Sequence, residues 1–281
     1  MSAPARRELF RISAAGAPRR RRHGPLWPVL RTVVPVLAAM VVAIVLWLAV
    51  SYLLLSPNRR FLVPPPGQVL TDSFGDWTHL RPMLAALGLT AEVALAGLGI
   101  ASVLGIVTAI LMSQASWVER AIYPYAVVLQ TVPILAIVPL IGLWFDYGFT
   151  SRVIVCVIIA LFPMIANTLF GLHSATQGAH ELFTLNNASR WQRLTKLQLP
   201  AALPSIFTGL RTSSGLSVIG AIVGDFFFKQ GEPGIGTLLD VYRARLQSTD
   251  LFAAIILASL FGIVVFAFFT VLGKFVVGKR S

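Results

Sequence analysis

The chain has 281 residues, of which 56% are hydrophobic and only 12% are charged, and its formal net charge is +12. Such an apolar composition excludes an ordinary soluble domain and indicates an integral membrane protein. The single cysteine, Cys156, excludes a disulfide framework within the chain. The four histidines show no H-E-x-x-H or similar spacing. We therefore expect neither a metal site nor another cofactor.

The N-terminal segment is rich in arginine, with four consecutive arginines at 19–22 shortly before the first apolar stretch. Such a run could suggest nucleic-acid binding, but its place beside an apolar segment is typical of a topology signal attracted to anionic lipid. We therefore expect membrane lipid, and no nucleic acid, as a partner. The apolar stretch is too long for a cleavable signal peptide, so we predict a disordered basic tail over 1–30 and an uncleaved first helix.

Six apolar segments follow one another along the chain, and each is close to the ~20 residues that cross ~30 Å of hydrocarbon as a helix. They lie at 33–55, 83–112, 122–145, 153–172, 206–223 and 251–272. None of them alternates as an outer-membrane strand does. We predict an all-α integral membrane protein with one six-helix domain over 31–276 and a short cytoplasmic tail at 277–281.

Basic residues set the expected orientation of these helices. The arginines before the first span, the basic residues after the sixth, and those at 190, 193 and 196 all fall on one side of the membrane. The other side carries fewer basic residues, and acidic residues offset most of them. We therefore expect a multi-pass membrane protein with both termini in the cytoplasm.

Two spans carry small residues at four-residue spacing, and such faces let helices approach closely. These residues are Gly97, Ala101, Gly105 and Ala109 in the second span and Gly209, Ser213 and Ser217 in the fifth. We expect both faces to pack against neighbouring helices.

Polar side chains inside the spans are costly in hydrocarbon unless they meet a partner or a wet cavity. The candidates for lining a translocation pathway are Gln130, Thr131, Asn167, Thr212, Ser213 and Ser217. Helix packing is an open alternative for the two serines. Pro133, Pro139 and Pro163 are expected to kink their helices.

A polar, basic stretch between the fourth and fifth spans has the pattern of a short amphipathic helix. Trp191, Leu194 and Leu197 recur every three residues, and a basic residue precedes each of them. Asn187 can enter the left-handed backbone region, so it can make the sharp turn that separates this helix from the preceding segment. Pro200 is expected to end the helix and to start the next one.

The same stretch resembles the cytoplasmic coupling loop of permease subunits in binding-protein-dependent ABC importers. The family pattern is E-A-A, three residues, G, nine residues, an aliphatic residue, one residue and then L-P. The positions that match in register are Glu181, Leu197, Leu199 and Pro200. Leu182 and Phe183 replace the alanine pair, and Asn187 replaces the glycine.

The resemblance implies a type I importer permease fold in the bacterial inner (plasma) membrane. In this fold a loop at about 176–203 docks on a separate cytoplasmic ABC ATPase. The residues expected to carry this coupling are Glu181, Asn187, Ala188, Ser189, Arg190, Trp191, Arg193 and Leu194. ATP would be bound by that partner, so this chain itself is expected to be a transport subunit and not an enzyme.

Weaker similarity over roughly residues 55–275 points to the nitrate/sulfonate/taurine subgroup of these permeases. It rests on a proline-rich run at 64–66, Q-T-V-P at 130–133 and G-I-G at 234–236. It implies a homodimer with the pore between two copies, and an extracytoplasmic solute-binding protein on the outer loops. The solute would be small, such as an alkanesulfonate, taurine, nitrate or a vitamin precursor like the thiamine pyrimidine.

Three other interpretations of the chain can be weighed. The segment at 273–279 spells most of a P-loop, but arginine follows where serine or threonine would hold magnesium, and no strand precedes it. A membrane-embedded enzyme would need paired carboxylates, a histidine pair or an activated nucleophile at membrane depth, and the sequence shows none. A self-sufficient secondary transporter of a small organic solute is the alternative, although matching internal halves are not evident.

Overall fold

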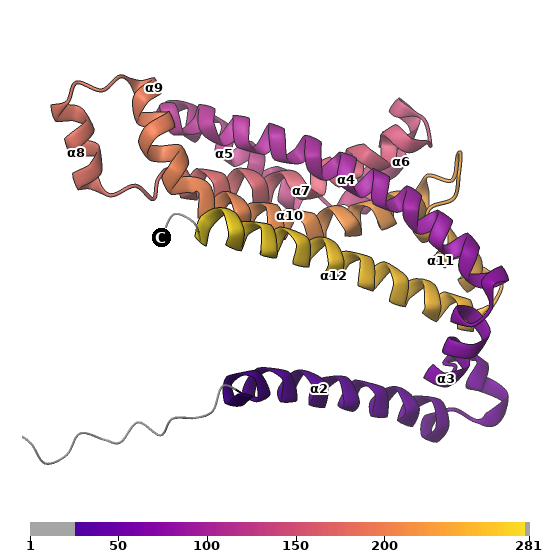
Figure 1. The fold of residues 1–281 in the computed structure, drawn as a ribbon. Helices are drawn as coiled ribbons and strands as arrows, with labels where there is room; N and C mark the ends of the chain where they lie inside the picture. The colour runs from indigo at the N-terminus through magenta and orange to yellow at the C-terminus, as the bar shows by residue number, and fades with distance from the viewer. Residues whose placement is uncertain (1–25, 279–281) are drawn as a thin grey trace, which may run out of the picture. The chain divides into compact units, whose positions relative to one another are not determined.

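The computed structural model describes residues 26–278, with side chains from residue 33 onward. The predicted basic tail and the last residues of the C-terminal tail therefore lie mostly outside the described residues. The chain divides into two compact units, 1–54 and 55–281. Figure 1 shows both units as ribbons in which every labelled element is a helix.

The described part of the first unit is α2 (Leu26–Ala49), which continues into a π-helical turn at Val50–Leu54. Its apolar part, Val33–Leu54, is long enough to cross a membrane, which agrees with the predicted first span. Most of its side chains are exposed within the single chain. Large apolar side chains such as these need an apolar environment.

The second unit contains the remaining spans and the segments that connect them. In chain order its helices are η3 (Pro57–Leu62), α3 (Pro66–Val69), η4 (Leu70–Phe74), α4 (Trp77–Gln114), α5 (Ser116–Thr131), α6 (Ile134–Phe145), α7 (Phe149–Leu172), α8 (Gln177–Leu185), α9 (Arg190–Arg193), η5 (Leu194–Gln198), α10 (Leu199–Phe227), α11 (Ile235–Ala244) and α12 (Ser248–Gly278). Among the described residues, five helices are long and apolar enough to span a membrane, or six if α5 and α6 form one bent span. The predicted all-α, six-span architecture is confirmed.

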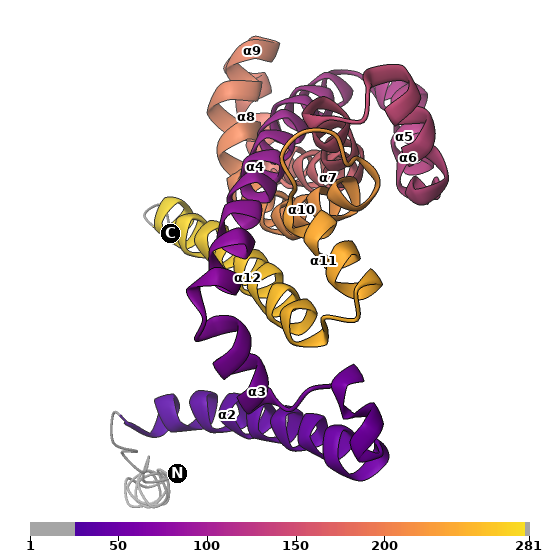
Figure 2. The same ribbon diagram turned by 90° about the vertical axis from the view of Figure 1, so that its right-hand side faces the viewer.

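Helix α7 lies at the centre of the second unit and packs along both α4 and α10 (Figure 2). Glycines make these contacts close: a Cβ at Gly97 would lie 2.3 Å from the Cβ of Cys156, and one at Gly105 would lie 2.5 Å from the Cβ of Met164. Ala101 and Ala109 on the same face of α4 are fully buried. The predicted packing face of the second span is therefore confirmed, and Cys156 is a buried packing residue.

The third predicted span is broken and not simply kinked. Helices α5 and α6 meet at an angle of 99° around Val132 and Pro133. Proline disfavours the helical conformation of the residue before it, and Val132 is accordingly extended, with φ −64° and ψ 128°. Pro139 and Pro163, in contrast, lie inside the helices α6 and α7.

Helix α4 begins at Trp77, six residues before the predicted start of the second span. The side chain of Asp76 caps this end by accepting a hydrogen bond from the backbone N–H of Thr78 at 2.8 Å. The side-chain and backbone hydrogen bonds from Thr78 stabilise the carboxylate and lower the pKa of Asp76. The local sequence thus extends the helix beyond its apolar part.

Candidate functional site

The turn between α8 and α9 is closed by backbone hydrogen bonds around Asn187. The N–H of Ala188 donates to the carbonyl of Phe183 at 2.9 Å, and the N–H of Asn187 donates to that of Thr184 at 3.0 Å. Asn187 has a φ of +50°, in the left-handed region. This is a Schellman motif, which commonly has glycine at that position. The predicted turn at Asn187 is confirmed.

We expect Asn187→Gly to leave the stability of this turn unchanged, because glycine adopts a left-handed φ without strain. Asn187→Val should destabilise the turn by about 1–2 kcal/mol, since a β-branched residue is strained at positive φ. Limited proteolysis of the purified variants measures the difference as faster cleavage between α8 and α9 in the valine variant. Equal cleavage of both variants would contradict the assignment of this turn.

Helix α9 starts with a capping box that the sequence interpretation missed. The backbone N–H of Gln192 donates to Oγ of Ser189 at 3.3 Å, and the N–H of Ser189 donates to Oε1 of Gln192 at 2.9 Å. Ser-x-x-Gln before a helix is the sequence signal for this arrangement. Nη2 of Arg193 also donates to Oγ1 of Thr184 at 3.1 Å, which joins α9 to α8. The two short helices therefore hold a defined angle.

Some apolar side chains of this loop are buried in the protein interior, and others lie on the surface. Leu194 is 4% exposed and belongs to the core formed with α4, α7 and α10. Trp191 is 71% exposed, and Leu182 and Leu185 are also exposed. Leu194 thus anchors the loop to the helical bundle, whereas the other three leave an apolar surface at the end of the unit where α8 and α9 project (Figure 1).

Helical structure continues from Arg190 to Phe227, so the prediction that Pro200 ends the short helix is wrong. The π-helical η5 connects α9 directly to α10. Pro200 lies in the first turn of α10, directly after the π-helical turn, and supplies no backbone N–H to the helix there. The loop is therefore mechanically continuous with a membrane-spanning helix.

The polar coupling residues lie on the surface of this loop. Glu181 is exposed and accepts a hydrogen bond from Nε2 of Gln177 at 3.0 Å. Asn187, Ser189 and Arg190 are exposed, and Ala188 is partly buried. The structure thus places the predicted coupling residues on α8, on the turn after it and on α9, except Leu194, which lies buried at the start of η5. Their docking role stays a prediction.

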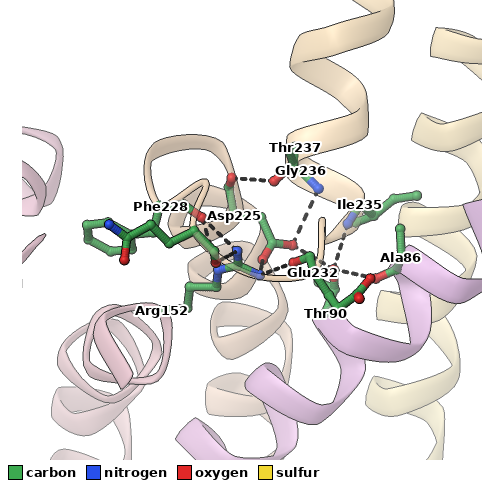
Figure 3. A network of polar contacts seen from close by, with 10 residues as sticks. Ala86, Thr90, Arg152, Asp225, Phe228, Glu232, Ile235, Gly236 and Thr237 are labelled. Atoms are coloured by element: carbon green, nitrogen blue, oxygen red, sulfur yellow. Dashed lines mark hydrogen bonds and ion pairs between the residues drawn. The ribbon is translucent and has the colours of Figure 1, made fainter. Parts of the chain in front are cut away.

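A second polar cluster lies at the opposite end of the unit and is almost fully buried. Arg152, in the first turn of α7, is 1% exposed, and Asp225, in the last turn of α10, is 0% exposed. Nη1 of Arg152 lies 3.3 Å from Oδ1 of Asp225. Figure 3 shows the guanidinium and the carboxylate pointing toward each other, surrounded by the chain that leads from α10 to α11.

The guanidinium of Arg152 also holds the loop after α10. Its N–H groups donate to the carbonyl of Phe228 at 2.7 and 3.1 Å, to that of Gln230 at 3.0 Å and to that of Glu232 at 3.2 Å. A buried charge is tolerated only when such partners replace water. Arg152 therefore fixes the path of this loop as well as pairing with Asp225.

Asp225 joins α4 and α11 to the same cluster. Its Oδ2 accepts a hydrogen bond from Oγ1 of Thr90 at 2.6 Å, and Oγ1 of Thr90 accepts one from the N–H of Ile235 at 2.8 Å. A Cβ at Gly234 would lie 2.0 Å from Oδ2 of Asp225, so only glycine fits there. The close approach of the Asp225 carboxylate thus explains why glycine is the first residue of the G-I-G sequence at 234–236.

Sequence reasoning missed this cluster, because Arg152 and Asp225 lie just outside the predicted fourth and fifth spans and were not paired. A signal was available: one arginine and one aspartate stand at the ends of two predicted spans on the same side of the membrane. Opposite charges at the ends of adjacent helices favour pairing. Their adjacency follows only from the packing of α7 against α10.

The structure separates the predicted pathway residues into three groups. Ser213 and Ser217 are buried, and they donate to the carbonyls of Ala160 and Ser214. Helix packing therefore accounts for both serines, and the predicted packing face of the fifth span is confirmed. Gln130 lines a cavity of about 330 Å³ at the break between α5 and α6.

The other pathway candidates have hydroxyl or amide groups bonded within their own helices. Thr131 donates to the carbonyl of Val128, Thr212 to that of Thr208 and Asn167 to that of Pro163. Thr131 and Thr212 are exposed within the single chain, and Asn167 is partly buried. Their lining of a pathway stays a prediction.

Comparisons with known proteins identify the class of protein to which this chain belongs. The family described as "Binding-protein-dependent transport system inner membrane component" matches residues 101–278. The formylaminopyrimidine transport permease ThiX of Halalkalibacterium halodurans is 36% identical over 216 residues, which cover 75% of this chain and 82% of ThiX. The taurine transport permease TauC of Escherichia coli is 29% identical over 266 residues, 90% of each chain.

A solved amino acid ABC transporter, crystallised with histidines, has the same fold. It superimposes with a TM-score of 0.59 at 16% identity and covers 74% of this chain and 98% of its own. The chain belongs to the family of binding-protein-dependent transport system inner membrane components. It is a membrane-spanning permease subunit of an ABC importer, and the secondary-transporter alternative is not supported.

Proposed function

We propose that the α8–α9 loop couples this permease to a separate cytoplasmic ABC ATPase. The observation that supports the proposal is the hydrogen-bonded, exposed turn at Asn187. It presents Leu182, Leu185 and Trp191 beside the exposed basic residues Arg190 and Lys196. Exposed aromatic and aliphatic side chains on a fixed scaffold are typical anchors of protein interfaces. Because η5 continues into α10, movement of the loop would be transmitted directly to a membrane helix.

In this proposal both termini and the α8–α9 loop lie in the cytoplasm, as the distribution of basic residues favours. Two copies of the chain form the pore, and ATP is hydrolysed by the partner and not by this subunit. The outer end, including the loop that Arg152 fixes, faces an extracytoplasmic solute-binding protein. A pre-ordered loop favours such docking because little conformational entropy is lost on binding.

The solute is proposed to be small, as in the relatives. ThiX is named for formylaminopyrimidine and TauC for taurine, and ThiX has the higher identity to this chain. The cavity beside Gln130 is walled mainly by leucine, isoleucine, valine and phenylalanine, and its lining contains no cationic side chain. These features favour a neutral vitamin precursor such as a pyrimidine over nitrate or a sulfonate.

Affinity purification of the full chain from its native membrane tests the assembly. We expect a P-loop ATPase to co-purify in stoichiometric amount, because nucleotide-driven motion requires a stable contact with the α8–α9 loop. Trp191→Asp should remove the ATPase from the purified complex, whereas Thr131→Ser, far from the loop, should not. A chain that purifies without any ATPase would contradict the proposed coupling.

A further inference from the structure

A groove of about 530 Å³ runs between the first half of α10 and the last turns of α12. The two helices approach closely there, since a Cβ at Gly273 would lie 3.2 Å from the Cβ of Phe207. The groove lies toward the end of the unit that carries α8 and α9, where α12 ends beside the start of α10 (Figure 1). It is separate from the α8–α9 loop, from the cavity at Gln130 and from the Arg152 cluster.

The groove has a strongly one-sided charge. Arg211 and Lys274 line it, and no acidic residue does. In the part of the chain that the structure describes, neither cation forms an ion pair with a carboxylate. The hydroxyls of Thr208 and Thr270 in its wall donate to carbonyls of their own helices. An anion is therefore the complementary ligand.

One N–H donor of Arg211 is buried without a hydrogen-bond acceptor. Its Nε is buried and makes no hydrogen bond within the described residues. The guanidinium lies 5.5 Å from the centroid of the Phe266 ring, a cation–π contact that stabilises the charge but accepts no ordinary hydrogen bond. A guanidinium in a membrane helix is costly unless its fork of donors is matched, and a phosphate group matches it with two parallel hydrogen bonds.

The remaining wall suits acyl chains. Phe207, Phe269 and Val277 line the groove next to the two cations. We propose that this groove binds an anionic glycerophospholipid, with its phosphodiester on Arg211 and Lys274 and its acyl chains against the apolar wall. Basic pockets between membrane helices on the cytoplasmic side favour such head groups. The proposal uses the orientation proposed above, which places this end of the helices at the inner leaflet.

Two other occupants fit less well. The first helix of a second copy is apolar, but the segment that precedes it is basic, so it supplies no counter-charge. A freely soluble oxyanion would satisfy the cations, yet it would leave the apolar wall uncovered. Of these three occupants, only the phospholipid supplies both an anionic group for the two cations and acyl chains for the apolar wall.

The test is a titration of the delipidated full-length protein in detergent with phosphatidylglycerol or phosphatidylcholine, followed by thermal unfolding. We expect wild-type protein to bind phosphatidylglycerol more tightly than phosphatidylcholine. The double variant Arg211→Gln/Lys274→Gln should bind phosphatidylglycerol about 30-fold more weakly, from about 1 kcal/mol for each cation. The matched double variant Arg120→Gln/Lys196→Gln, which removes two exposed cations elsewhere, should bind as the wild type does.

Should the double variant not fold, the exposed Lys274→Glu alone is expected to weaken phosphatidylglycerol binding and to leave phosphatidylcholine binding unchanged. Equal affinity of wild type and groove variants for phosphatidylglycerol, or equal affinity of the wild type for both lipids, would overturn the proposal. Displacement of the lipid by millimolar inorganic phosphate would assign the groove to a free oxyanion instead. Loss of dimer in the groove variants without a change in lipid binding would assign it to a second copy. The lipid titration uses the permease alone, so failure of the ATPase to co-purify would contradict the proposed coupling without changing any of these outcomes.

Discussion

Replacing Arg152 with methionine is expected to lower the free energy of unfolding by about 3–5 kcal/mol, the usual effect of removing one partner from a buried ion pair. The variant leaves the carboxylate of Asp225 buried at 0% exposure with Thr90 and the N–H of Gly236 as its hydrogen-bond donors. It also frees the carbonyls of Phe228, Gln230 and Glu232. Thermal unfolding in detergent, followed by size-exclusion chromatography, measures the loss.

A double variant distinguishes the effect of losing the ion pair from the effect of losing the packing of the arginine side chain. Arg152→Met/Asp225→Leu removes both charges, and such replacements of a buried pair are often neutral or stabilising, so much of the loss should be recovered. Arg243→Gln, which breaks an exposed pair with Asp240 at 2.8 Å, should change stability by less than about 1 kcal/mol. A single Arg152→Met variant as stable as the wild type would show that the cluster does not hold this end together.

Ala188→Glu should lower solute uptake by about 30-fold or more while the protein stays in the membrane at its normal level. Ala188 lies between the turn at Asn187 and the cap at Ser189, so a bulky carboxylate there would enter the proposed contact with the ATPase. Loss of an interface hot spot of about 2 kcal/mol corresponds to that factor. Uptake by cells or vesicles, normalised to the amount of permease, is the measurement.

Thr176→Asp is the matched control for this variant. It places a carboxylate on the same loop, at the cap of α8, where aspartate is favoured. We expect uptake close to that of the wild type. Normal uptake in Ala188→Glu, or equal loss in both variants, would remove Ala188 from the docking surface.

Local chemistry made a large part of the fold predictable. Runs of apolar residues located the membrane helices, and small residues at four-residue spacing located the α4 face that packs on α7. Asn187 was predictable as a turn because few residues other than glycine and asparagine tolerate a left-handed φ. Each of these inferences depends on neighbours in the sequence.

Features that depend on distant parts of the chain could not be predicted in the same way. Trp191 and Leu194 share one apolar stripe, and only the packing of η5 against the core decides which of them is buried. The pairing of Arg152 with Asp225 needs the contact between α7 and α10. Pro133 predicted a kink, but the 99° angle between α5 and α6 depends on how α6 packs against α7.

Reconstitution in proteoliposomes tests the central claim most directly. The permease is purified together with its co-purifying ATPase, and the solute-binding protein is loaded with radiolabelled solute and supplied on the opposite side. The account predicts solute accumulation that requires ATP on the side of the α8–α9 loop and is lost in Ala188→Glu. Accumulation by the permease alone, driven by an ion gradient without ATP or ATPase, would contradict it.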